Sequence, residues 1–154
     1  MAAKTRALSA VKDVRHEVLT YEPSQDNFGQ HAAIELGLNE DGVLKTLVVA
    51  HERELAVCCV PVSGHLSLKH AAKALGWKRA EMAEPAKAQR ATGYVVGGIS
   101  PLGMLQKLQV LIDASVRDLP TITVSAGQRG LSVQLAPADL AELTGGEFAD
   151  ISAP

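Results

Sequence analysis

The sequence predicts an α+β protein built as a single domain around a mixed, β-barrel-like sheet, and three observations support this prediction. Short apolar runs typical of strands outnumber the amphipathic runs typical of helices. Several of these strands follow one another without a helix between them, which excludes a regular βαβ alternation with a purely parallel sheet. The chain has 154 residues, the length of one domain, so we expect residues 1–154 to form a single unit.

The N-terminal part of the chain predicts two helices and three strands. We expect a helix at residues 4–14, a strand at 16–22, a helix at 28–36, and strands at 43–50 and 55–62. Asn27 is a favourable cap for the second helix, and Gly37 is a typical residue to end it. The last two strands are rich in β-branched residues and are joined by a polar link, so they predict a hairpin.

The remaining elements are bounded by strong local signals. We expect helices at residues 68–75, 85–92 and 137–144, and strands at 78–83, 94–96, 110–113, 121–125, 131–135 and 148–151. Ser67 caps the first of these helices and Gly76 ends it. Pro85 begins the next helix and Gly93 closes it, since proline favours the start of a helix and glycine its end.

Composition excludes several classes of function. A net charge of −2 and a pI of about 6.2 argue against broad nucleic-acid binding, although a small site for one or two phosphates stays open. No apolar run approaches the ~20 residues of a membrane span, and the N-terminus lacks a signal-peptide core. We therefore expect a cytoplasmic protein in which Cys58 and Cys59, neighbours on opposite faces of a strand, stay reduced.

The glycine-rich stretch GGISPLG at residues 97–103 follows the predicted strand 94–96 and resembles two catalytic motifs without completing either. The frame from Gly98 to Gly103 has the spacing of a phosphate-binding loop, but Met104 and Leu105 replace its lysine and hydroxyl residue. The same stretch gives little support to a nucleophile elbow, because Leu102 occupies the position of that motif's second glycine. Pro101 also lacks the N–H that an oxyanion hole would need after Ser100.

Two interpretations of this stretch remain open from the residues alone. It is either a structural turn, or a loop in which N–H groups of Gly97, Gly98 or Ile99 bind an oxyanion or a ligand carbonyl. Lys45 poses a similar choice, because it lies in an apolar strand and either faces solvent or supplies a cation to a cleft.

No other constellation predicts chemistry. The five histidines and two cysteines show no metal-ligand spacing, so we expect no metal site and no cofactor. Neither cysteine lies at a helix start or beside an obvious cation, so we expect neither to be a nucleophile.

Read together and in order, five blocks resemble the YbaK/prolyl-tRNA synthetase-associated editing domain family. They are TYE…NFG at 21–29, KTLVV at 45–49, PVSGHLSLKHAAKALG at 61–76, AQRATGYVVGGISPLG at 88–103 and VSAGQRGL at 124–131. The resemblance covers residues 14–151 and is strongest to YbaK-type Cys-tRNA(Pro) deacylases. It implies an α+β fold with a barrel-like sheet surrounded by helices. It also implies hydrolysis of a wrong amino acid from the 3′ end of tRNA(Pro), with prolyl-tRNA synthetase as a transient partner.

The resemblance also implies which residues form the site. Lys45 matches the family's lysine that holds the 3′-terminal adenosine and its phosphate. Gly97, Gly98 and Pro101 belong to the loop whose backbone polarises the ester carbonyl, and together with Lys45 they are the expected catalytic residues. The expected substrate-binding residues are Tyr21, Phe28, Thr46, Ile99, Ser100 and Ser125.

The family's chemistry implies that the substrate cysteine's own thiol attacks its ester, so that the enzyme supplies position and oxyanion stabilisation. Ser132 stands where YbaK-type relatives often carry an acidic residue. Editing of another small amino acid, such as alanine, serine or threonine, is therefore an alternative. A non-catalytic module that binds aminoacyl ends or nucleotides is another.

Overall fold

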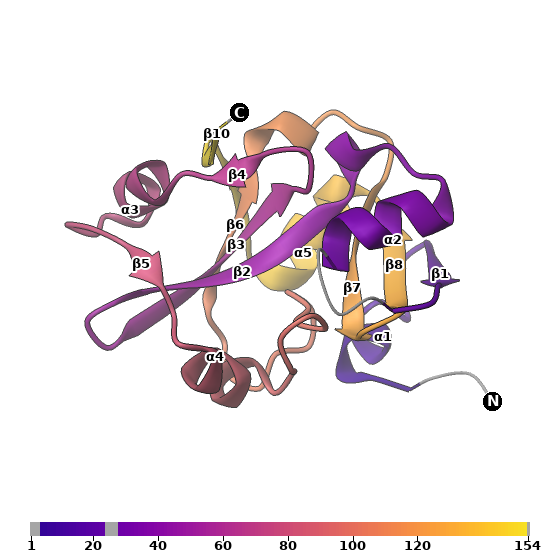
Figure 1. Cartoon of the computed structure of the whole chain (residues 1–154), viewed down its shortest axis with the longest axis horizontal. Helices are drawn as coiled ribbons and strands as arrows, with labels where there is room; N and C mark the ends of the chain where they lie inside the picture. The colour runs from indigo at the N-terminus through magenta and orange to yellow at the C-terminus, as the bar shows by residue number, and fades with distance from the viewer. Residues whose placement is uncertain (1–3, 24–27, 154) are drawn as a thin grey trace.

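The computed structural model describes residues 4–23 and 28–153, with the backbone alone for residues 28–30 (Figure 1). The helices are α1 (Arg6–Ala10), α2 (Phe28–Leu36), α3 (Leu68–Leu75), α4 (Pro85–Thr92) and α5 (Pro137–Thr144), with short 3-10 turns at Glu40–Gly42 and Ala114–Val116. The strands are β1 (His16–Thr20), β2 (Leu44–His51), β3 (Glu54–Pro61), β4 (His65–Leu66), β5 (Glu81–Met82), β6 (Gln109–Asp113), β7 (Ile122–Gln128), β8 (Leu131–Leu135), β9 (Glu147–Ala149) and β10 (Ser152–Ala153). The predicted α+β class is confirmed.

The larger sheet has the strand order β5-β2-β3-β6-β9 and is mixed, as predicted. β2 and β3 form the expected antiparallel hairpin, whereas β3 pairs with β6 and β6 with β9 in parallel. Successive side chains of a strand point to opposite faces. Val57 and Cys59 of β3 accordingly pack into the main core, while Cys58 and Val60 pack into a second core under α3. Apolar residues on both faces explain why β3 reads as a continuous apolar run.

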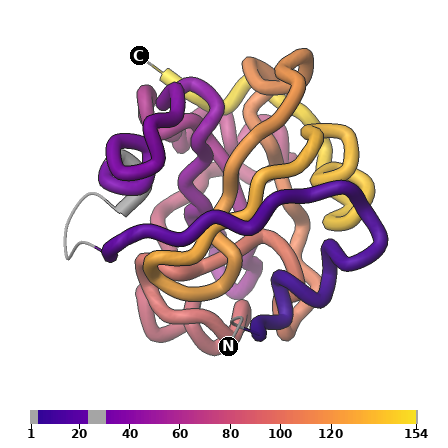
Figure 2. The backbone as a smooth tube through the Cα atoms, turned by 90° about the vertical axis from the view of Figure 1, so that its right-hand side faces the viewer, coloured from indigo at the N-terminus to yellow at the C-terminus, as the bar shows by residue number. Residues whose placement is uncertain are grey.

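The smaller sheet is antiparallel, with the order β1-β8-β7, and it encloses the main core from the other side. Figure 2 shows the N-terminal segment crossing in front of β7 and β8. The two sheets meet at a parallel bridge between Val43 and Thr123. Beyond this bridge β2 and β7 diverge. With the short antiparallel pair β4 and β10, the described strands form three separate sheets rather than a closed ring. The sheet is barrel-like but open.

Most local predictions are confirmed with shorter bounds. The Ser67 hydroxyl accepts a hydrogen bond from the His70 N–H and caps α3. Gly76 and Gly93 end α3 and α4 with left-handed φ values of +74° and +81°, where glycine is favoured. The predicted cap Asn27 lies outside the described residues.

The strand predicted at residues 94–96 is wrong. The segment forms a turn between Gly93 and Gly97, both with left-handed φ values. Its apolar residues have a different explanation, since Tyr94 is buried in the core whereas Val95 is 56% exposed. The glycine-rich loop therefore follows helix α4 through a turn and does not extend a strand. Among the described residues, no helix is long and apolar enough to cross a membrane.

Candidate functional site

A cavity of about 460 Å³ opens where β2 and β7 diverge. Its volume lies within the range of small-molecule sites. β2 and β7 form two of its walls, and residues 82–88 and the glycine-rich loop contribute the others. Six of the residues expected in the site line it: Tyr21, Lys45, Thr46, Gly97, Ile99 and Ser125.

Lys45 lies on β2 and lines the cavity. Val43 and Thr123 are bridged in parallel, so Lys45 and Ser125 each lie two residues beyond the bridge, on opposite sides of the opening. Partial burial lowers the pKa of Lys45 from its ordinary value, because desolvation disfavours the ammonium form. Of the two interpretations of Lys45, the structure supports a cation that borders a cleft.

The edge of β2 beside Lys45 is open, because β5 pairs with β2 only at Val49 and Ala50. Successive residues of a strand direct their backbone groups to opposite edges. The Val43 carbonyl accepts a hydrogen bond from the Val62 N–H, on the edge that faces β3. The Val48 carbonyl accepts one from the Ala83 N–H, on the opposite edge of β2. Thr46 shares the orientation of Val48, so its N–H and C=O point toward the cavity.

The cavity end of the glycine-rich loop is a tight turn. The Gly98 N–H donates to the Val95 carbonyl at 2.9 Å, and Gly97 has a φ of +91° that favours glycine. Gly98 packs against the β7–β8 connection, where a Cβ would lie 2.8 Å from the Cα of Gln128. Gly97 is thus needed for its conformation and Gly98 for close packing.

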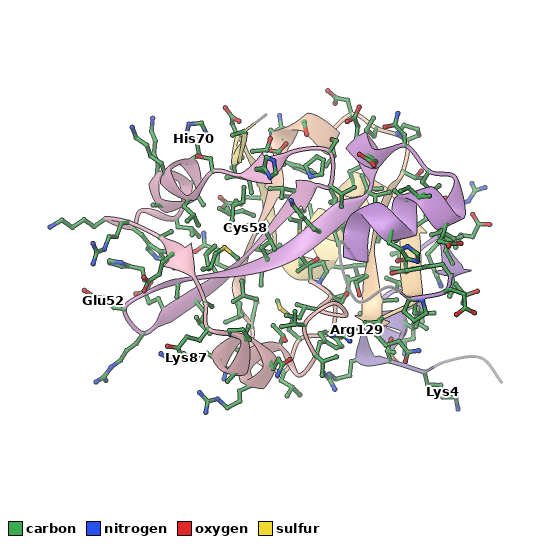
Figure 3. All side chains as sticks on the ribbon, viewed as in Figure 1. Lys4, Glu52, Cys58, His70, Lys87 and Arg129 are labelled. Atoms are coloured by element: carbon green, nitrogen blue, oxygen red, sulfur yellow. The ribbon has the colours of Figure 1, made fainter. Side chains whose placement is uncertain are left out.

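Side chains from two other elements hold this turn in place. The Gln89 side chain of α4 accepts from the Val96 N–H at 3.0 Å. Nε and Nη2 of Arg129 both donate to the Val96 carbonyl, at 3.0 and 2.8 Å. Arg129 projects from the β7–β8 turn beside the loop (Figure 3).

These contacts orient the peptide between Val96 and Gly97. The carbonyl oxygen and the N–H of a trans peptide point in opposite directions. Because Arg129 holds the Val96 oxygen, the Gly97 N–H points away from that guanidinium. In the part of the chain that the structure describes, neither the Gly97 nor the Ile99 N–H has a hydrogen-bond acceptor, and both residues line the cavity.

The other residues expected in the site lie elsewhere. Ser100 is fully buried, and its hydroxyl accepts from the Leu102 N–H at 3.2 Å. Pro101 is buried, and neither it nor Gly98 lines the cavity. The side chain of Phe28 lies outside the described residues.

Two polar residues of the cavity, His65 and Thr123, are not among the predicted site residues. Ser132, which the sequence distinguishes only by its departure from the family's acidic residue, also lines the cavity. Ser132 pairs across the β7–β8 hairpin with Ser125, so two serines lie side by side in the wall. The short link between these strands does not predict this pair, because the register shifts between Ser125 and Gln128. Among the described lining residues there is no carboxylate.

The cysteines are buried and unpaired, as predicted. Burial raises the pKa of both Cys58 and Cys59 to about 12, so their thiols are protonated at neutral pH. Cys58 lies within the fold, away from the surface (Figure 3). Within residues 4–23 and 28–153, no three His, Cys, Asp or Glu side chains gather as metal ligands would.

The fold and cavity define a small α+β domain whose ligand-sized site offers a cation and unpaired backbone N–H groups. The chain belongs to the aminoacyl-tRNA editing domain family, whose model matches residues 23–143. The resemblance inferred from the sequence motifs is thus confirmed.

Individual relatives extend this finding. The chain is 35% identical over 153 residues to EbsC of Enterococcus faecalis, named as a proposed Cys-tRNA(Pro)/Cys-tRNA(Cys) deacylase, covering 97% of this chain and 93% of EbsC. It is 30% identical to a stretch of the proline–tRNA ligase of Trichlorobacter lovleyi, over 60% of this chain and 16% of the ligase. The crystal structure of a proposed trans-editing enzyme for prolyl-tRNA synthetase shares the fold, with a TM-score of 0.85, 22% identity and coverage of 99% of this chain and 100% of that one.

Proposed function

We propose that this protein is a trans-editing enzyme that hydrolyses the ester of mischarged Cys-tRNA(Pro). One observation carries the proposal: the cavity combines the Lys45 cation with the unpaired N–H groups of Gly97 and Ile99. A pocket that selects small amino acids by size alone discriminates by only about 1–3 kcal/mol, so a separate hydrolytic site serves fidelity.

The two N–H groups act as the oxyanion hole. Donors fixed before the reaction stabilise the charge that develops on the ester oxygen, and losing one such donor costs about 10²–10³ in kcat. Arg129 supports this hole indirectly, because it holds the Val96–Gly97 peptide in the orientation that directs the Gly97 N–H to the substrate. Arg129 is therefore a positioning residue.

Lys45 binds the phosphate of the terminal adenosine across the cavity from this loop. Tyr21, Thr46 and Ser125 contact the rest of the aminoacyl end, since all three line the same space. The open edge of β2 adds the backbone groups of Thr46 as further hydrogen-bond partners.

The substrate supplies the nucleophile. The thiol of the misacylated cysteine loses its proton as its sulfur attacks the ester carbon, and a C–S bond forms. Collapse of the oxyanion breaks the bond to the ribose oxygen, which takes up a proton. Water then opens the resulting thiolactone to release cysteine. Buried thiols with pKa values near 12 support this route, because neither Cys58 nor Cys59 would be a thiolate at neutral pH.

A second candidate is an editor of another small amino acid on tRNA. It is favoured by Ser132, a neutral residue in the wall where YbaK-type relatives often carry an acid. The substrate's α-ammonium group would then bind to the hydroxyls of Ser125 and Ser132 instead of a carboxylate.

We place the enzyme in the cytoplasm, with prolyl-tRNA synthetase as a transient partner. The acidic pI of about 6.2 favours borrowing part of the tRNA specificity from a synthetase.

A deacylation panel tests the proposal. Cys-, Ala-, Ser- and Pro-tRNA(Pro) are incubated with the protein, with and without the synthetase, and the remaining ester is measured over time. Cys-tRNA(Pro) should be hydrolysed fastest and Pro-tRNA(Pro) spared. Turnover of Ala- but not Cys-tRNA(Pro) would select the second candidate. No turnover of any of them would reject the enzyme and leave a binding module.

A further inference from the structure

Residues 67–80 carry an unusual concentration of positive charge. This segment contains Lys69, Lys73, Lys78 and Arg79 and no acidic residue. The chain has 15 Lys and Arg and 17 Asp and Glu, so 11 basic and 17 acidic residues remain elsewhere, a formal charge of −6. The overall acidity of the protein therefore hides a basic region at residues 67–80, which we call the basic surface.

The four cations of the basic surface are exposed and unpaired. α3 buries Ala71 and Ala72 and turns Lys69 and Lys73 to solvent. Within the described residues, none of the four cations lies in an ion pair. Lys69 and Lys73 are four residues apart on α3, so their ammonium groups lie on the same face of the helix. Two unpaired like charges on one exposed face suit a partner of opposite sign.

One acidic neighbour of the segment, Glu54, already accepts a hydrogen bond. Trp77 donates from Nε1 to a Glu54 carboxylate oxygen at 2.9 Å. This hydrogen bond ties the segment to the β2–β3 hairpin and leaves the basic side chains to face outward around a shallow depression. In Figure 3 the labelled His70 of this segment lies at the opposite end of the molecule from Lys4.

The segment that carries the basic surface is flanked in sequence, on both sides, by residues that line the cavity. His65, two residues before the segment, and Met82, two residues after it, both line the cavity. β5 then pairs with β2 directly beside that opening. A chain whose end enters the cavity could therefore continue over α3 and residues 77–80.

We propose that the basic surface binds the backbone phosphates of the tRNA acceptor end whose aminoacylated terminus occupies the cavity. This inference rests on the proposed function. Charge complementarity carries it, since a row of exposed cations beside the site fits a polyanion. Lys45 then holds the terminal nucleotide, and the basic surface holds the nucleotides before it.

The experiment compares two substrates with the same ester. One is full-length aminoacyl-tRNA(Pro), and the other is an aminoacylated CCA trinucleotide that ends before the stem. The variant Lys69→Ala/Lys73→Ala should raise KM for the full-length substrate about tenfold with kcat unchanged, and should leave the trinucleotide unaffected. The slope of log KM against log salt concentration should fall by about 1.4–1.8, because each lost phosphate contact removes about 0.7–0.9.

The matched control is Lys12→Ala/Arg15→Ala, which removes the same charge from exposed positions near α1. It should leave KM and the salt slope nearly unchanged. Equal effects of the two double variants would overturn the proposal in favour of a general effect of net charge. The proposal would also be overturned if Lys69→Ala/Lys73→Ala lost activity only in reactions stimulated by the synthetase. That result would assign the basic surface to protein docking.

Binding of uncharged tRNA separates this inference from the proposed function. Fluorescence anisotropy with labelled tRNA needs no turnover, so it reports on the basic surface even if the wild-type protein hydrolyses nothing. Weaker binding by the α3 variant alone supports the surface, and equal binding by both variants and the wild type rejects it.

Discussion

In the first half of the glycine-rich loop, the N–H groups of Gly97 and Ile99 have no acceptor among the described residues, and both residues line the cavity. In the second half, three backbone groups of Leu102 and Gly103 are paired. The Leu102 carbonyl accepts from the Tyr94 hydroxyl at 2.6 Å, and the Gly103 carbonyl accepts from Arg6 Nε at 3.0 Å. One short loop therefore has a half that anchors and a half that is available to a ligand. The difference teaches that unsatisfied N–H groups can persist when their neighbours over-determine the backbone.

Replacing the glycine of each half should separate these roles most clearly. Gly97→Ala forces a side chain onto a φ of +91° and should turn the peptide away from the substrate, lowering kcat by about 10²–10³ with a modest loss of stability. Gly103→Ala should instead lower the Tm and spare kcat, because its Cβ would lie 2.6 Å from the backbone of Arg6. Deacylation kinetics and thermal melts measure both. A wild-type kcat in Gly97→Ala would contradict the assignment.

The cation opposite the first half provides the next test. Lys45→Met should raise KM and lower kcat/KM by about 10–100-fold, since one charge-assisted contact contributes about 1.5–3 kcal/mol. It should also stabilise the protein near neutral pH by removing a partly desolvated ammonium. A folded-state pKa below the unfolded value penalises the wild type while Lys45 is charged. The difference in unfolding free energy between Lys45→Met and the wild type should therefore shrink as pH rises from the lowered pKa of Lys45 through 10.5. Denaturant titrations at several pH values measure it. A wild type more stable than Lys45→Met at pH 7 would be the opposite result.

Two arginines hold the two halves, and conservative replacement should distinguish them. Arg129→Lys cannot reproduce the two parallel donations to the Val96 carbonyl and should lower kcat about tenfold with KM little changed. Arg6→Lys loses contacts to Gly103, Thr92 and Gly93 at the anchored end, so it should lower the Tm and leave kcat near the wild-type value. Parallel losses of kcat and Tm in both variants would mean that Arg129 is only structural.

The smallest effect is expected deep in the core. Cys58→Ala with Cys59→Ala should leave kcat within about twofold, because the substrate supplies the thiol, and should cost about 1–3 kcal/mol of stability. The same pair replaced by serine controls for volume. Loss of activity with an unchanged melting profile would implicate a protein thiol.

The sequence predicted what local chemistry decides. Ser67, Gly76 and Gly93 act within a few residues of the helix ends they define, so these ends were found correctly. The strand expected at 94–96 failed because one buried ring and two exposed valines produce the same apolar run. Tertiary burial alone tells them apart.

The site was predictable in part for the same reason. The motifs placed Lys45 and the glycine-rich loop in one site, but the cavity exists because β2 and β7 separate beyond Val43 and Thr123. The contribution of Ser132 depends on a cross-strand pair, and that of Arg129 on a contact 33 residues away. Such long-range contacts leave no local pattern.

The contacts of Arg6 have a consequence for synthesis. Its donation to Gly103 joins positions 97 residues apart, and among the described strands β1 pairs only with β8, which begins at Leu131. Bringing such distant segments together costs loop-closure entropy before any contact forms. A ribosome-bound chain that ends before residue 131 lacks the partner of its first strand. The loop's anchor therefore forms late, and an incomplete nascent chain would have no working site.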